Sequence, residues 1–179
     1  LLSRANYAPS LLQVMAAELV EHFYNRPMPA NATLPVIIDE TMVRDALMNK
    51  DILDKVTRQF FISIEHDRRY LLLANVIASG DLSRAASGEY TEGMTIGEVH
   101  HEAQSFWASM FGGIDGLALV EDAVDEMEGL GLIRRVGDDR WALRSPSIRR
   151  LLGSRETIER RLEGFLSAPP TKDLDFRQN

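Results

Sequence analysis

Cysteine is absent from the 179-residue chain, which excludes a disulfide framework, a thiolate zinc site and a cysteine nucleophile. Long hydrophobic runs are also lacking. The longest, such as 71–74 and 36–38, are far shorter than the roughly 20 residues of a membrane-spanning helix. Nothing in the sequence indicates secretion, so we expect a cytoplasmic protein without a membrane partner. The composition, 45% hydrophobic and 26% charged, is ordinary for a globular protein.

Catalytic motifs are equally scarce. The sequence has no Gly-x-Ser-x-Gly elbow, no Gly-x-x-x-x-Gly-Lys-Ser/Thr loop and no Gly-x-Gly-x-x-Gly fingerprint. His100 and His101 are adjacent, but no second histidine follows either of them four residues later, so the His-Glu-x-x-His zinc motif is missing. We therefore expect no metal, no resident cofactor and no catalysis. A metal-dependent enzyme built on the two histidines is kept as a third hypothesis.

Hydrophobic periodicity predicts a mainly helical chain with one small β-hairpin. Two β-prone segments, 132–136 and 140–144, flank a Gly-Asp-Asp turn at 137–139. Residues 80–94 are small and polar and are expected to form a loop after a helix that stops at Ser79-Gly80. A short extended run is expected at 34–38. The expected helices cover residues 9–25, 40–48, 52–64, 68–78, 95–110, 117–130, 147–152 and 154–165.

From residue 68 to 144 the expected order is helix, helix, turn, helix, β-hairpin. This is the order of a winged helix-turn-helix. The third helix continues into the hairpin through Leu130, Gly131 and Leu132, and the glycine allows the chain to reverse there. The predicted fold is therefore mainly α, a helical layer plus a winged helix-turn-helix with a small β-hairpin wing.

The third helix of a winged helix usually enters the major groove of DNA, but the charge of this one opposes that role. Residues 98–131 contain eight acids and no Lys or Arg. Phosphate contacts require basic side chains, so a helix lined with carboxylates would be repelled from the groove. We expect this face either to be solvated or to bind protein. It consists of Glu121, Asp122, Asp125, Glu126 and Glu128.

The segment that follows has the opposite charge. Residues 134–161 hold nine arginines and only four acids, which the net charge of −7 conceals. Arginine suits bidentate pairing with carboxylates or phosphates. Two interpretations are open: the arginines pair with acids or helix-end carbonyls of this chain, or they contact an acidic partner, another subunit or a nucleic-acid backbone. The candidates for contact are Arg134, Arg135, Arg140, Arg149 and Arg150.

Three segments carry recognisable motifs. Residues 2–13 read Leu-Ser-Arg-Ala-Asn-Tyr-Ala-Pro-Ser-Leu-Leu-Gln, residues 57–71 contain Arg-Gln-Phe-Phe and Asp-Arg-Arg-Tyr, and residues 143–162 contain Ser-Pro, Leu-Leu-Gly and Ile-Glu. In this order they resemble bacterial STAND-type and related ORC-like AAA+ ATPases. The first resembles the lid helix after the nucleotide-binding core, the second the stretch before the winged helix, and the third the closing segment.

The resemblance implies a parent protein that binds ATP and Mg through a P-loop domain before residue 1. The chain begins at Leu1 without a methionine, so we expect it to be a piece of that protein. Arg4 falls where a nucleotide-sensing arginine would lie, although the chain departs from the pattern at Ala5 and Ala8. The implied partners are the missing ATPase domain and a protein partner or a second copy, with nucleic acid only as a weak partner.

Four regions follow from this interpretation. Residues 1–26 are the remnant of the ATPase lid helix, 27–66 a connecting helical layer, 67–166 the winged helix, and 167–179 a mobile tail. We expect a non-catalytic regulatory and protein-interaction module of a STAND/AAA+-like protein. The alternative is a DNA-binding winged helix that uses its arginine-rich hairpin and following helices instead of the acidic third helix.

Overall fold

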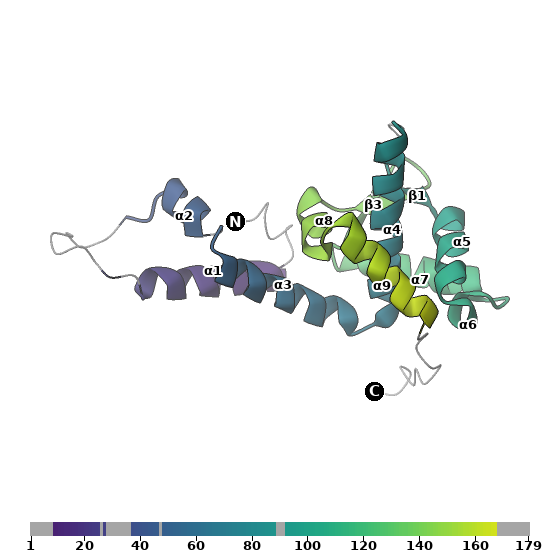
Figure 1. Ribbon diagram of the computed structural model, residues 1–179, viewed down its shortest axis with the longest axis horizontal. Coiled ribbons are helices and arrows are strands. Elements are labelled where there is room, and N and C mark those ends of the chain that lie inside the picture. Colours follow the sequence, from purple (N-terminus) through teal and green to yellow (C-terminus); the bar gives the residue numbers. More distant parts are fainter. Residues whose placement is uncertain (1–8, 26, 28–36, 47, 89–91, 168–179) are drawn as a thin grey trace. The chain divides into compact units, whose positions relative to one another are not determined.

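The structure is a computed structural model, and it describes residues 9–25, 27, 37–46, 48–88 and 92–167 (Figure 1). The described chain is mainly helical, with one small three-stranded antiparallel sheet. Its contacts divide it into two compact units, Leu1–Ser63 and Ile64–Asn179. No described helix is both long and apolar enough to cross a membrane.

The first unit contains α1 (Pro9–Tyr24), α2 (Glu40–Ala46) and α3 (Lys50–Glu65), whose last two residues belong to the second unit. These helices confirm the three predicted there to within a few residues. Met15 and Leu19 of α1 and Ile52 and Val56 of α3 are buried at the i, i+4 spacing of a helix face. The predicted extended run falls mostly on residues 34–36, which lie outside the described residues.

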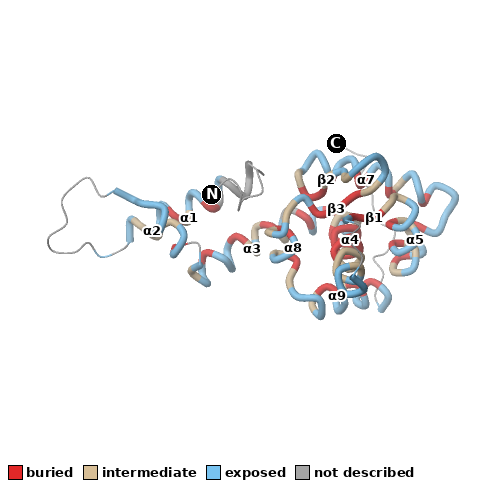
Figure 2. Tube along the Cα trace, turned by 90° about the horizontal axis from the view of Figure 1, so that it is seen from above, coloured by how far each residue is buried: buried red, intermediate tan, exposed pale blue. Residues whose placement is uncertain are grey.

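The second unit is built around α4 (Arg68–Ser87). Asp67 begins this helix by accepting a hydrogen bond from the Arg69 amide at 2.8 Å. Eight consecutive residues, 71–78, are buried, so this helix is covered on all sides and not on one stripe (Figure 2). It contacts α5, α7, α9 and strand β3.

The predicted end of α4 at Ser79-Gly80, and with it a loop that begins at residue 80, is wrong. Gly80 lies inside the helix, where a Cβ would come within 2.4 Å of the Met94 sulfur. The glycine therefore makes room for a neighbouring strand and does not end the helix. The helix ends instead at Gly88, which has a left-handed conformation with a φ of 79°.

The second part of the unit alternates short strands and helices. Strand β1 (Met94–Thr95) leads into α5 (Ile96–Phe106), α6 (Ala108–Phe111) and α7 (Gly116–Gly129). A single helix was predicted over 95–110, but it is interrupted at Trp107, whose φ of −143° is not helical. The indole of Trp107 is 1% exposed and contacts the rings of Phe111 and Phe165. Burial of this large side chain accounts for the break.

The predicted hairpin is confirmed as β2 (Ile133–Val136) and β3 (Arg140–Leu143), joined through Gly137 at a φ of 65°. Strand β1, which the sequence did not predict, adds to the free edge of β3, so the sheet order is β1-β3-β2. Met94 pairs with Trp141 in one ladder, and Ile133 pairs with Leu143 in the other.

Two helices complete the unit, as predicted. They are α8 (Pro146–Leu152) and α9 (Arg155–Ser167). Ser145 caps α8 by accepting from the amides of Ser147 and Ile148, and Pro146 takes the first helical position. Helix α9 packs along α4 and buries Ile158, Leu162 and Phe165. The predicted tail beyond Ser167 lies outside the described residues.

Candidate functional site

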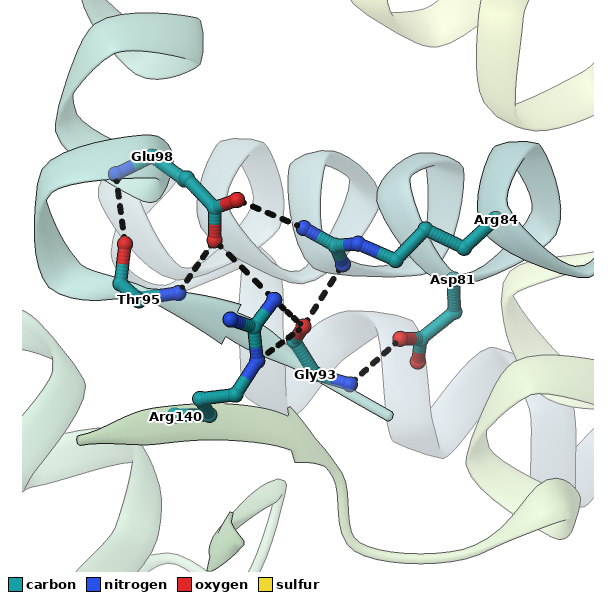
Figure 3. Close-up of polar contacts among 6 residues, drawn as sticks. All are labelled: Asp81, Arg84, Gly93, Thr95, Glu98 and Arg140. Carbon is teal, nitrogen blue, oxygen red and sulfur yellow. Dashed lines mark hydrogen bonds and ion pairs between the residues drawn. The ribbon is translucent and has the colours of Figure 1, made fainter. Parts of the chain in front are cut away.

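Residues from α4, β1, β3 and α5 converge on the start of β1 (Figure 3). We call this group the Gly93 cluster. It consists of Asp81, Arg84, Gly93, Thr95, Glu98 and Arg140.

The carbonyl oxygen of Gly93 accepts hydrogen bonds from two guanidinium groups. Arg84 Nη1 donates at 2.7 Å, and Arg140 donates from Nε at 3.1 Å and from Nη2 at 2.8 Å. The Gly93 amide donates to Asp81 Oδ1 at 3.1 Å. Both polar groups of one backbone unit therefore connect α4 to β3.

Only glycine fits at position 93. Its φ is 78°, in the left-handed region that other residues rarely adopt. A Cβ at this position would lie 2.7 Å from the carbonyl oxygen of Trp141 on the neighbouring strand. The close approach of the two backbones is what places the Gly93 carbonyl between the two arginines.

Glu98 supplies a carboxylate to both arginines. Its oxygens lie 3.1 Å from Arg84 Nη2 and 3.3 Å from Arg140 Nη2. It also accepts from the Thr95 amide at 2.7 Å, in the capping box predicted for this helix. Desolvation opposes ionisation, but the Thr95 hydrogen bonds and the arginine charges outweigh it and lower the pKa of Glu98.

Asp81 lies on the other side of Gly93. Burial raises the pKa of this carboxyl, and the Gly93 amide and the charges of Arg84 and Arg149 oppose the rise only in part. Its hydrogen bond holds the Gly93 backbone against α4.

The two arginines of β2 both form contacts with nearby residues of their own chain. Arg134 forms an ion pair with Glu92, next to Gly93. Arg135 donates to the carbonyl oxygen of Asp138 in the turn, and its guanidinium lies 5.7 Å from the centroid of the Trp141 ring. With Arg140 in the Gly93 cluster, three of the five candidate arginines bind within their own chain.

The other two candidates, Arg149 and Arg150, differ from these three. Both are exposed on α8, because Ile148 and Leu152 are the residues of this helix that are buried. Among the described residues, neither guanidinium group forms a hydrogen bond or an ion pair. The positive charge of Arg149 does act on Asp81, where it lowers the pKa of the carboxyl.

The acids of α7 are mostly unengaged as well. Glu126 is the exception among the five predicted for this face: the Tyr70 hydroxyl donates to its Oε2, and Arg69 Nη2 lies 3.4 Å from the same oxygen. Burial and this hydrogen bond raise the pKa of Tyr70 to about 12. The remaining four are exposed, and their carboxylates form no hydrogen bond or ion pair with any described residue. They are Glu121, Asp122, Asp125 and Glu128.

The two adjacent histidines separate in the fold. His100 Nε2 lies 2.9 Å from the carbonyl oxygen of Phe111, so the ring connects α5 to the end of α6. His101 is exposed. Within the described part of the chain, no three His, Asp or Glu side chains are grouped as metal ligands. The hypothesis of an enzyme built on these histidines gains no support from this geometry.

Arg4, the predicted nucleotide-sensing residue, lies outside the described residues. Asp81, Arg84 and Gly93 were not singled out in the sequence, because they lie in a stretch predicted to be loop and their partner Arg140 is far away along the chain.

Comparison with protein-family models, curated proteins and solved structures finds no significant match.

Proposed function

We propose that the second unit is a winged helix and that the chain is a regulatory, protein-interaction module of a STAND/AAA+-like ATP-binding protein. The topology supports the first part. A strand after the first helix pairs with the hairpin that follows the third helix, in the order β1-β3-β2. In such a unit α4, α5 and α7 are the three helices, and β2 and β3 form the wing.

The observation that carries the functional part is the face of α7. In a DNA-binding winged helix this helix would meet phosphates. Here its exposed face carries four carboxylates without partners among the described residues, and no basic side chain. Negative charge so close to DNA opposes binding, whereas a protein surface with basic side chains would favour it.

The ATP-binding part of the proposal rests on the sequence resemblance. The parent would bind ATP and Mg in a P-loop domain encoded before Leu1, act in the cytoplasm, and use this module to contact that domain or a further protein. The module itself is proposed to be non-catalytic. The gene-encoded sequence upstream of Leu1 is the direct test: a Gly-x-x-x-x-Gly-Lys-Ser/Thr loop after a predicted strand is expected, and its absence would contradict this part.

The interaction part is tested with labelled duplex DNA. Fluorescence anisotropy of the 179-residue chain against random-sequence and genomic duplexes is expected to show no sequence-specific binding at about 150 mM salt. Tight, sequence-dependent binding would overturn the proposal. The variant Glu121→Lys/Asp125→Lys is the matched control, because it removes the repulsion and should increase non-specific binding.

A second function is favoured by a specific observation, the exposure of Arg149 and Arg150. These arginines could follow a phosphate backbone while α7 faces away from it. This alternative predicts weak binding that falls steeply with salt and is lost in Arg149→Glu/Arg150→Glu. It also predicts little effect of Arg134→Gln beyond the loss of its ion pair, since that side chain already contacts Glu92.

A further inference from the structure

We propose that the exposed arginines of α8 bind the acidic face of α7 on a second copy of this chain. This inference rests on the proposed role as a protein-interaction module and names the partner. The basic side of the contact is Arg149 and Arg150. The acidic side is Glu121, Asp125 and Glu128, together with the partly exposed Leu117.

The basic side is a helix face that its own unit leaves uncovered. Ile148 and Leu152, four residues apart, turn one side of α8 to the interior. Arg149 and Arg150 therefore point to solvent. The comparison with α9 is informative, because its exposed arginines are already paired: Arg155 Nε lies 2.7 Å from Glu159, and Arg160 Nη2 lies 2.8 Å from Glu156. Helix α8 contains no acid to do the same.

The acidic side is continuous. Leu117, Glu121, Asp125 and Glu128 follow one another at intervals of four, four and three residues, which places them along one line of the helix. Leu117 is 43% exposed. Ile114, just before α7, is fully exposed. A partner that covers this line would bury apolar side chains at one end and meet carboxylates along the rest.

Charge complementarity points to a second copy as the occupant. Among the described residues, no side-chain hydrogen bond or ion pair joins α7 to α8 within one chain. Each copy thus presents both halves of a contact that it does not form internally. The contact joins two different surfaces, the arginines of α8 and the acids of α7. A copy that uses one of these surfaces to bind a second copy therefore keeps its other surface free to bind a third copy.

The association is expected to be weak and salt-dependent. Exposed ion pairs contribute little each, and the net charge of −7 repels two copies at long range. At about 0.1 M salt the Debye length is about 10 Å, so this repulsion is screened while contacting charges still attract. Self-association is therefore expected at high protein concentration, decreasing as salt is raised.

Sedimentation equilibrium of the full 179-residue chain tests the proposal. The weight-average mass is expected to rise with concentration at about 0.1 M NaCl and to return to the monomer at about 0.5 M. Arg149→Gln/Arg150→Gln and Glu121→Gln/Asp125→Gln should each weaken association by about three- to tenfold. An equimolar mixture of the two variants should recover a heterodimer, because each keeps the half that the other lacks, and should not grow beyond it.

Two matched controls separate this contact from a general effect of charge. Arg155→Gln/Arg160→Gln removes the same positive charge from arginines that are already paired, and Asp138→Asn/Asp139→Asn removes two acids from the hairpin turn. Both should associate like the unchanged chain. The inference is overturned if the unchanged chain is monomeric throughout, if the α8 variant associates normally, or if the variant mixture stays monomeric. The DNA measurement above is independent of all three outcomes, so the proposed function can survive this failure.

Discussion

Helix α7 and the arginine-rich segment that follows it carry opposite net charges, yet the charged side chains of the two regions differ in their contacts. Arg134, Arg135 and Arg140 all bind within their own chain. Of the five acids on α7, only Glu126 is engaged among the described residues. The difference shows that a count of charges does not indicate which of them are available to a partner. The hairpin arginines support the fold, whereas the other four α7 acids and the two α8 arginines form no side-chain hydrogen bond or ion pair with the described residues.

The largest expected effect comes from Gly93, which organises the engaged arginines. Gly93→Ala should lower the free energy of unfolding by about 3 kcal/mol, because alanine is strained at this φ and its Cβ would overlap the Trp141 backbone. Urea unfolding followed by tryptophan fluorescence measures this, since both tryptophans, Trp107 and Trp141, lie in the second unit.

Gly137→Ala is the matched control for Gly93→Ala. Gly137 also has a positive φ, but nothing lies within 4 Å of a Cβ built there. It should cost only about 1 kcal/mol. Equal losses in the two variants would show that conformational strain alone, and not the close approach of β1 to β3, makes Gly93 necessary.

The next effect separates engaged from free arginines. Arg140→Gln removes hydrogen bonds to Gly93 and the ion pair with Glu98, and should cost about 1–2 kcal/mol. Arg150→Gln changes the same charge on an exposed side chain and should stay within about 0.5 kcal/mol. Urea midpoints of the two variants make the comparison. If both lose the same stability, the distinction between the two groups of arginines is wrong.

Much of the fold could be predicted from local patterns. The hairpin follows from a Gly-Asp-Asp turn between β-prone segments, and α7 from its apolar spacing, because both signals lie within a few neighbouring residues. Strand β1 could not be found in this way. It has two residues, too few for an alternating pattern, and it is defined by pairing with Trp141 and Arg140 far along the chain.

The candidate site shows the same limit. The candidates on α7 and α8 could be selected because charge is visible in sequence, but their availability could not. Arg140 and Arg150 are the same residue type, so the sequence does not distinguish them. The structure does, because Arg140 donates to the Gly93 carbonyl oxygen and pairs with Glu98. Gly80 was misjudged for a related reason: its role is to admit Met94, a contact between elements that a local helix-stop signal cannot represent.

The contact between Glu126 of α7 and the Tyr70 hydroxyl can be detected by titration of the tyrosine. The pKa of Tyr70 is about 12, above the ordinary value of 10, so the fold favours the neutral phenol. Its contribution to stability is present below pH 10 and is lost as the pH rises from 10 through 12. Ultraviolet titration should show one of the four tyrosines ionising late, and Tyr70→Phe should remove that step. A uniform titration near pH 10 would contradict the contact.

The smallest effect tests whether the free acids of α7 support the fold at all. Glu128 is exposed in the last turn of the helix, where the helix dipole disfavours negative charge. Glu128→Gln should therefore raise the free energy of unfolding by about 0.3 kcal/mol. Glu126→Gln, two residues away, should lower it by about 1 kcal/mol, because it weakens the contacts of Tyr70 and Arg69. Changes of opposite sign in the free energy of unfolding, measured by urea titration, would show that acids of one helix differ in role. Glu126 would stabilise the unit, whereas Glu128 would be retained at a small cost in stability. Binding to a partner surface would explain that cost. A loss of stability in both variants would remove that reason to look for a partner.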